Sequence, residues 1–248
     1  MLFRSPFTKI DRTEALGATV LLKGEGLTDA RRAADALARE RGFVPVHPYD
    51  DPLVIAGQGT IALEMLAEHP ELDSLVVPVG GGGLISGIAV AAKALSPDIE
   101  IVGVQSALYP SMYRILRGED PGPPAEAATL AEGIAVKEPG QLTRRIVAAL
   151  VGGVRLVTER QLEGAVELLI ERQKLVVEGA GAAGVAALIA DPEPFRKRKV
   201  GIVLTGGNID ARLLASLLMR GLVRAGRDRK STRLNSSHIQ KSRMPSSA

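Results

Sequence analysis

The sequence predicts an α/β protein built on an open, mostly parallel, twisted sheet with helices on both faces. Three runs rich in valine, isoleucine and leucine, at residues 75–79, 99–104 and 200–204, indicate buried strands because they are mostly apolar. Helical patterns alternate with these runs, and such alternation is typical of parallel α/β sheets. The low aromatic content (3%) and the 27 glycines suit helices packed closely on a sheet.

Residues 1–54 are expected to be the remnant of a smaller α/β domain. Strands are predicted at residues 18–22 and 43–46, with a helix between them that Thr28 is expected to cap. Strand, helix and strand in succession form the basic unit of an α/β sheet.

A loop dense in prolines and acids, from His47 to Pro52, closes this part. His47, Asp50 and Asp51 are candidates for a metal site or an acid/base pair. Alternatively, the two carboxylates cap the next helix, because adjacent Asp residues in proline-flanked turns more often do so.

Residues 55–227 are expected to form the larger domain. Its predicted elements are a helix at 55–67, a strand at 75–79, a helix to Leu95, a strand at 99–104, an irregular proline-rich loop at 109–140, a helix at 141–150, a strand at 154–157, a helix from Thr158 to Arg172, a helix opening within 176–184, a strand at 200–204 and a helix at 209–222. Thr158 and Gln161 have the spacing of a capping box. The last helix is apolar over most of its surface, which predicts core or interface.

The basic character of the chain comes from its last residues, 228–248. This tail carries five Lys or Arg residues and one Asp, a net charge of +4, whereas the whole chain carries +3, so residues 1–227 carry −1. The tail is polar and rich in serine, which predicts disorder or unrelated read-through. A basic RNA-binding arm is the alternative, but no aromatic side chain interleaves its charges, so no nucleic-acid partner is expected.

Composition also bears on the compartment. The chain has no cysteine, so it has neither a disulfide framework nor a cysteine metal site, which is compatible with a reducing cytoplasm. It has no apolar run long enough to span a membrane, and residues 1–11 lack the apolar centre of a signal peptide. We therefore expect a cytoplasmic protein without a membrane partner.

Four consecutive glycines directly after the strand at 75–79 are the main candidate site. Glycines at this position leave backbone N–H groups free to converge on an anion, and the helix that follows directs its positive end at the same point. Alternatively, the glycines form only a tight turn between strand and helix and bind no ligand. A dinucleotide fingerprint does not fit, because Leu84 stands where its middle glycine belongs and Gln105, not an acid, ends the next strand. A single phosphate ester fits better.

The strand at 200–204 ends in Thr205-Gly-Gly-Asn208. Parallel sheets bind ligands at the carboxyl ends of their strands, so this end and the glycine run are expected to serve one site. A hydroxyl suits a neutral hydrogen-bond acceptor. A small phosphorylated heteroaromatic ring between the two strand ends would satisfy both.

Five motifs in this order resemble the threonine/serine dehydratase branch of the fold type II pyridoxal-phosphate enzymes, which includes serine racemases. They are His47-Pro-Tyr-Asp-Asp-Pro-Leu-Val-Ile-Ala-Gly-Gln-Gly-Thr60, Val77-Pro-Val-Gly-Gly-Gly-Gly-Leu84, Glu132-Gly-Ile-Ala-Val136, Val177-Glu-Gly-Ala-Gly181 and Leu204-Thr-Gly-Gly-Asn-Ile-Asp210. The resemblance runs from about residue 5 to residue 227. It implies a tryptophan synthase β-like fold that is incomplete at the N-terminus, and pyridoxal 5'-phosphate as cofactor.

The resemblance also implies roles for individual residues. The backbone N–H groups of Gly80, Gly81, Gly82, Gly83 and Leu84 would bind the cofactor phosphate. Thr205, where the family usually has Ser or Cys, would face the pyridine nitrogen. Glu178 and Glu132 would line the cofactor pocket, although either also fits a structural acid at a helix end.

Two family segments are not found in this sequence: the Ser-x-Lys-x-Arg-Gly segment with the Schiff-base lysine, and the Ser-x-Gly-Asn-His segment that holds the substrate carboxylate. No catalytic residue is therefore assigned, and the chain resembles the family without its N-terminal portion. The metal ligands of racemase-like members correspond to Gln105 and Ser111, so no metal is expected.

The implied activity is β-elimination of L-threonine, L-serine or both to a 2-oxo acid and ammonia, by a homo-oligomer. The 248-residue chain by itself is expected to be inactive. Serine racemase, hydroxyaspartate dehydratase and β-replacement as in cysteine synthase are alternatives within the same fold. A non-catalytic module that binds pyridoxal phosphate is the alternative from another class.

Overall fold

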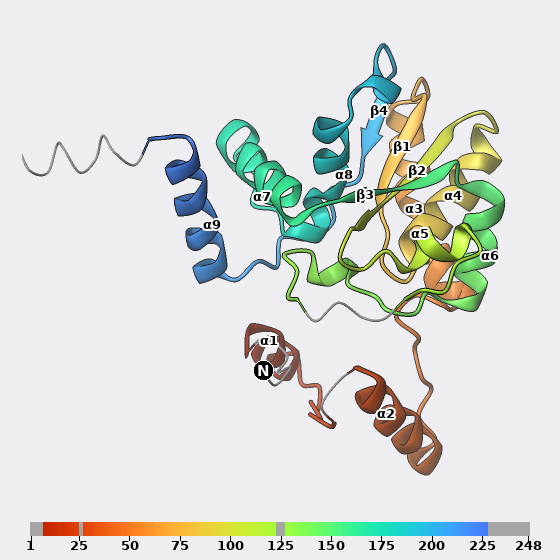
Figure 1. The fold of residues 1–248 in the computed structure, drawn as a ribbon. Helices are drawn as coiled ribbons and strands as arrows, with labels where there is room; N and C mark the ends of the chain where they lie inside the picture. The colour runs from red at the N-terminus through yellow and green to blue at the C-terminus, as the bar shows by residue number, and fades with distance from the viewer. Residues whose placement is uncertain (1–6, 25–26, 123–126, 228–248) are drawn as a thin grey trace, which may run out of the picture. The chain divides into compact units, whose positions relative to one another are not determined.

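The computed structural model describes residues 7–24, 27–122 and 127–227 (Figure 1). The chain divides into two compact units between His47 and Pro48. The serine-rich tail at 228–248 lies outside the described residues, so its predicted disorder is not tested.

The first unit contains two helices, α1 (Phe7–Ala15) and α2 (Leu27–Arg41). The strands predicted at 18–22 and 43–46 are wrong: both segments lack strand pairing within the described residues. Most of their apolar side chains are exposed, Val44 to 87% for example. A strand needs a partner that pairs with its backbone hydrogen-bonding groups, and neither segment has one among the described residues. Thr28 lies inside α2, not before it, and its side chain is outside the described set.

The second unit is built on a parallel sheet, as predicted. Its four described strands, β1 (Ser74–Pro78), β2 (Glu100–Ser106), β3 (Gly153–Val157) and β4 (Val200–Ile202), lie in the order β3-β2-β1-β4. Every neighbouring pair is parallel. Each strand falls within two residues of the predicted bounds at both ends, so the apolar runs of the sequence located the sheet correctly.

Helices cover both faces of this sheet (Figure 1). The helices of the second unit are α3 (Pro52–Glu68), α4 (Gly83–Leu95), α5 (Ser111–Leu116), α6 (Gln141–Leu150), α7 (Glu159–Leu168), α8 (Gly179–Ala190) and α9 (Ala211–Arg224), with short turns η1 (Glu132–Ile134), η2 (Leu169–Gln173, a π-helix) and η3 (Glu193–Phe195). Alternate residues of each strand face opposite sides. Leu75 and Val77 pack with α3, α4 and α6, whereas Val76 packs with α7 and α8.

Helix starts follow the capping residues of the sequence. Asp51 accepts hydrogen bonds from the N–H groups of Leu53 (2.8 Å) and Val54 (3.1 Å), so α3 begins at Pro52 and not at the predicted Ile55. The predicted capping box at Thr158 is present and opens α7.

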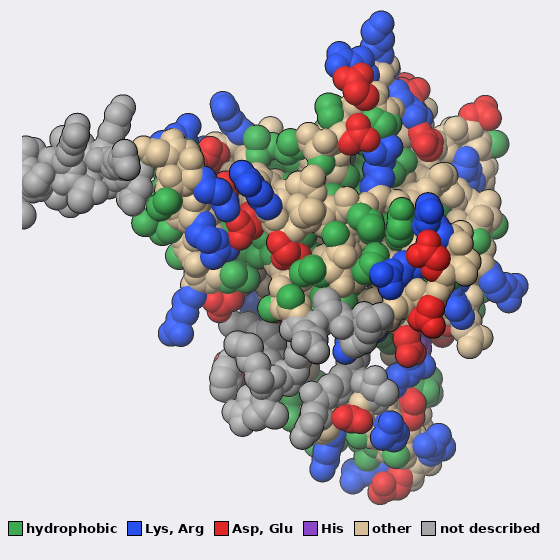
Figure 2. Space-filling model, viewed as in Figure 1, with side chains coloured by type: hydrophobic (Ala, Val, Ile, Leu, Met, Phe, Trp, Pro, Cys, Tyr) green, Lys and Arg blue, Asp and Glu red, His purple; other side chains and the backbone are tan. Residues whose placement is uncertain are grey.

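Of the two roles predicted for the last helix, α9, the core role fits only part of it, and the interface role stays a prediction. Leu217 is buried, but Leu213, Met219, Leu222 and Val223 are all more than a third exposed. On the face shown in Figure 2, acidic and basic side chains are interspersed over the second unit, which agrees with a body of nearly neutral charge. No helix in the described part of the chain is long and apolar enough to span a membrane.

Candidate functional site

The junction between β1 and α4 forms a loop of buried backbone donors. Gly81, Gly82 and Gly83 are buried, and Gly82 is the N-cap of α4 without any side-chain cap. The N–H groups of residues 80–84 donate no hydrogen bond to another described residue. Buried N–H groups in native proteins are nearly always paired, and a helix N-terminus attracts negative charge. This loop therefore suits an anionic ligand.

Close neighbours require glycine at these positions. A Cβ on Gly81 would overlap the ring of Tyr49, and one on Gly83 would lie 2.9 Å from the Tyr49 Cα. Gly82 has φ +98°, which is strained for other residues, and its Cβ would lie 2.8 Å from the Cβ of Thr143. The glycine run is thus enclosed by the loop at Tyr49 and by α6.

The two acids beside Tyr49 both cap helices. Asp51 caps α3, as described above. Asp50 caps α6, because its carboxylate accepts hydrogen bonds from the N–H groups of Gln141 (2.9 Å), Leu142 (3.0 Å) and Thr143 (3.1 Å). The prediction that these acids cap the next helix is therefore confirmed for Asp51 and wrong for Asp50, which caps the distant helix α6 instead. No group of three or more His, Asp or Glu that suits a metal ion is found among the described residues.

The second predicted strand end lies beside the first, because β4 pairs with β1 in parallel. Thr205 is half-buried, and its backbone oxygen lies where a Cβ on Gly181 would be. Gly181 thus allows α8 to approach the end of β4 closely.

Glu178 connects this strand end to the rest of the site. Its N–H donates to the carbonyl of Gly206 (3.1 Å), and its Oε2 accepts from the N–H of Asn208 (3.1 Å). Although Glu178 is the N-cap residue of α8, its side chain makes no capping hydrogen bond to that helix. Its carboxylate therefore orders the 205–208 loop and does not serve as a cap of its own helix.

Turn η1 joins the two ends. A Cβ on Gly133 would lie 3.1 Å from the Glu178 Oε1, and a Cβ on Gly80 would lie 3.2 Å from the Gly133 carbonyl. Gly80, Gly133, Glu178 and Gly206 consequently form one continuous wall. Glu132, also on η1, is exposed.

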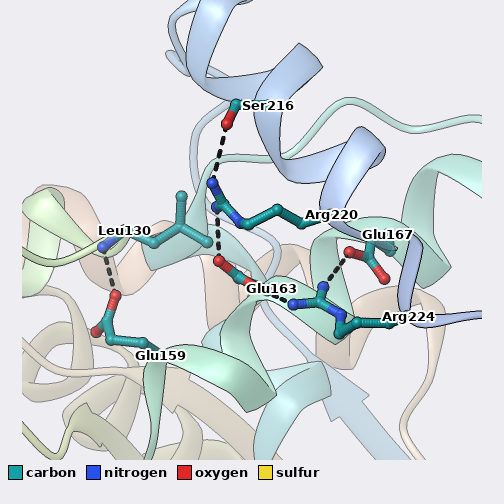
Figure 3. Close-up of polar contacts among 7 residues, drawn as sticks. All are labelled: Leu130, Glu159, Glu163, Glu167, Ser216, Arg220 and Arg224. Atoms are coloured by element: carbon teal, nitrogen blue, oxygen red, sulfur yellow. Dashed lines mark hydrogen bonds and ion pairs between the residues drawn. The ribbon is translucent and has the colours of Figure 1, made fainter. Parts of the chain in front are cut away.

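Glu159 is a residue that sequence reasoning missed. Its carboxylate accepts hydrogen bonds from the hydroxyl of Thr129 (2.6 Å), the N–H of Leu130 (2.6 Å) and the hydroxyl of Ser106 (3.3 Å). Figure 3 shows the bond to Leu130. Glu159 thereby fixes the segment that leads into η1. The capping box at Thr158 located the helix start, but nothing local indicated a partner 29 residues away.

Gln105 and Ser111, which the resemblance matches to the metal ligands of racemase-like members, make protein hydrogen bonds. The Gln105 side-chain oxygen accepts from the N–H of Tyr113 (2.9 Å), and the Ser111 hydroxyl donates to the carbonyl of Val136 (2.7 Å). The buried Gln105 amide nitrogen has no partner among the described residues.

The family model described as "Pyridoxal-phosphate dependent enzyme" matches residues 4–206. An L-threonine ammonia-lyase of Thermotoga maritima is 44% identical over 223 residues, which cover 90% of this chain and 55% of that protein. An L-threonine ammonia-lyase of Geobacter sulfurreducens is 46% identical over 224 residues, 90% of this chain and 56% of that protein. The chain thus spans a little over half the length of these two relatives.

Solved structures of enzymes with related names are also similar to this chain. A threonine deaminase from T.th. matches with a TM-score of 0.77 and 37% identity, over 83% of this chain and 68% of that one. Maize serine racemase matches with a TM-score of 0.78 and 29% identity, over 87% of this chain and 68% of that one.

Proposed function

Because the chain belongs to the family of pyridoxal-phosphate-dependent enzymes, we propose that the glycine run binds the phosphate of pyridoxal 5'-phosphate. The observation that carries this proposal is the set of N–H groups at residues 80–84, three of them on the buried Gly81, Gly82 and Gly83, that have no acceptor in the described structure. An ester phosphate supplies several strong acceptor oxygens, and the N-terminus of α4 favours its charge.

We further propose that the whole protein deaminates L-threonine, L-serine or both to a 2-oxo acid and ammonia. The names of the relatives at 44% and 46% identity support this activity. Bound pyridoxal phosphate supplies the electron sink that allows loss of the α-proton and then of the β-hydroxyl. The residues of this chain hold the cofactor in place, and the chain as printed lacks the family's Schiff-base lysine segment.

The other predicted site residues are assigned to the ring. Thr205 offers a neutral hydroxyl to the pyridine nitrogen, which moderates the electron sink and favours β-elimination over transamination. Glu178 orders the loop that carries Thr205, and we assign turn η1, with Glu132 and Gly133, to the same wall of the pocket. In this proposal residues 55–227 are the cofactor domain and residues 1–54 are part of the smaller one.

The cofactor assignment is tested by calorimetric titration of the 248-residue chain. Pyridoxine 5'-phosphate is the probe, because it lacks the aldehyde that would react with any of the nine lysines. We expect saturable binding by the wild type and none by Gly82→Ala, whose Cβ would meet α6. Absence of binding by the folded wild type would refute the proposal.

The activity is tested separately, on a version extended with a family N-terminal portion that contains Ser-x-Lys-x-Arg-Gly. We expect 2-oxobutanoate from L-threonine or pyruvate from L-serine with the extended protein, and neither from the 248-residue chain. Turnover by the 248-residue chain would contradict the assignment of an incomplete site.

Serine racemase is the second candidate, favoured by the structural match to the maize enzyme. It is distinguished by D-serine formation from L-serine in the same extended protein, and 3-hydroxyaspartate is included as a further substrate.

We also propose a homo-oligomer, supported by the exposed apolar side chains of α9, and a cytoplasmic location, supported by the absence of cysteine.

A further inference from the structure

The carbonyl of Gly81 is held by two donors from one side. The buried hydroxyl of Thr143 donates to it at 2.7 Å, and the N–H of Gly140 donates to it at 3.2 Å. Both donors belong to the start of α6. A carbonyl with two partners is fixed in direction, so the Gly81 oxygen points toward α6.

This direction determines where the next N–H group points. The structure contains no cis peptide bond among the described residues, and in a planar trans peptide the C=O and N–H groups point in opposite directions. The N–H of Gly82 therefore points away from α6. It lies in the run whose N–H groups find no acceptor in the described structure.

The position of α6 itself is set by the loop at Tyr49. The Asp50 carboxylate accepts from three N–H groups of the first turn, and the Tyr49 hydroxyl donates to the carbonyl of Glu138 (2.9 Å). Asp50 thus fixes the turn that carries Thr143, and it neutralises the positive end of α6. The N-terminus of α4, where Gly82 is the cap, has no such side-chain acceptor among the described residues.

We infer that Thr143 is a positioning residue for phosphate binding and that Asp50 supports it. The Thr143 hydroxyl holds the Gly81 carbonyl toward α6, so the Gly82 N–H points to the opposite side, where the phosphate would bind. Asp50 caps the N-terminus of α6, so that the N-terminus of α4 is the one that binds the anion. This inference rests on the proposed cofactor site and names residues that act through the backbone without touching the ligand.

The test uses the 248-residue chain and pyridoxine 5'-phosphate in calorimetric titrations. Thr143→Val is expected to weaken binding about tenfold, roughly the factor for one net hydrogen bond, and Thr143→Ser to restore wild-type affinity. Asp50→Asn keeps an acceptor without the charge and is expected to weaken binding about threefold. Thr60→Val is the matched control, because it removes a hydroxyl that donates to a carbonyl (Gly57, 2.9 Å) on an exposed face of α3.

A second readout separates orientation from general loss of structure. In the wild type, the amide resonance of Gly82 is expected to shift on addition of the probe, and in Thr143→Val this shift is expected to shrink while the probe still shifts Leu84. Equal affinity and equal Gly82 shifts in wild type and Thr143→Val would overturn the inference and leave the cofactor site standing.

Failure of the wild type to bind would refute the cofactor site and the inference together. If Thr143→Val does not fold, the comparison passes to Asp50→Asn. Wild-type affinity of a folded Asp50→Asn variant, or weakened binding in Thr60→Val of the same size, would then overturn the inference.

Discussion

Replacing Glu159 by Gln tests how strongly one carboxylate holds the wall of the site. The substitution keeps the size and one acceptor oxygen, but it turns an amide N–H₂ toward either the Leu130 N–H or the Thr129 hydroxyl, both 2.6 Å from the carboxylate. A hydrogen bond to a charged group contributes roughly 1.5–3 kcal/mol. Because Glu159 is only half-buried, solvent screening favours the lower end.

We therefore expect Glu159→Gln to lower the free energy of unfolding by about 2 kcal/mol. For a unit of this size, that corresponds to a fall in Tm of about 4–8 °C. The measurement is urea and thermal unfolding followed by circular dichroism. Hydrogen exchange gives a local check, since the Leu130 amide should exchange faster in the variant.

Glu171→Gln is the matched control, the same substitution farther along the same helical run. Glu171 pairs with Arg227 at 3.4 Å, and the two side chains are 52% and 65% exposed. An ion pair this exposed contributes at most about 0.5 kcal/mol. Equal stability of the two variants, or unchanged exchange at Leu130, would refute the account of Glu159 as the support of η1.

Three further predictions concern helix ends and the contact between α7 and α9. Burial raises the pKa of Glu163, but hydrogen bonds from Arg224 and Arg220 outweigh it and hold that pKa below its usual value (Figure 3). The stability that Glu163 contributes should therefore be fully present at neutral pH and be lost as the pH falls below the pKa of the unfolded state, about 4.3. The wild type should accordingly lose stability between about pH 7 and about pH 3, and Glu163→Gln should lose less, as measured by the urea midpoint at each pH. An equal change of the midpoint in both proteins would contradict this prediction. Gly82→Ala should lower the free energy of unfolding by roughly 2 kcal/mol or more, because Gly82 has a positive φ and an added Cβ would contact α6. Urea unfolding measures this loss, with Gly57→Ala at an exposed position as the control. A smaller loss for Gly82→Ala than for Gly57→Ala would contradict the prediction. Asp51→Ala should lower stability by about 1 kcal/mol through loss of the α3 cap, and Asp51→Asn should recover most of it in the same assay.

Most of the second unit was predictable from the sequence because its signals are local. The apolar run before Gly80 marked β1, and the helix at Gln141–Leu150 was predicted with the observed bounds. The capping box at Thr158 has both of its hydrogen bonds. Each of these features depends on residues a few positions apart, so a single sequence contains all of the information.

The errors and omissions depend on distant partners. The segments at 18–22 and 43–46 have strand-like composition, but composition does not supply the neighbouring strand that a ladder needs. The sequence predicts that Asp50 caps the next helix, α3, whereas it caps α6, whose first residue lies 91 residues away. Glu159 was missed for the same reason. A local sequence pattern indicates the conformation that a segment prefers, but the roles of Asp50 and Glu159 depend on residues that only the folded chain places next to them.

The adjacent acids at the start of the second unit have a consequence for how this region tolerates change. Asp50 starts α6 and Asp51 starts α3, so two consecutive residues set the spacing of helices that are remote in the chain. One residue inserted between them would leave both carboxylates chemically intact, but it would lengthen the chain between them by up to about 3.5 Å, which is more than a hydrogen bond can stretch. Deletions and insertions should therefore be far more damaging here than conservative replacement, and a library of length variants would find this stretch to be a fixed-length spacer.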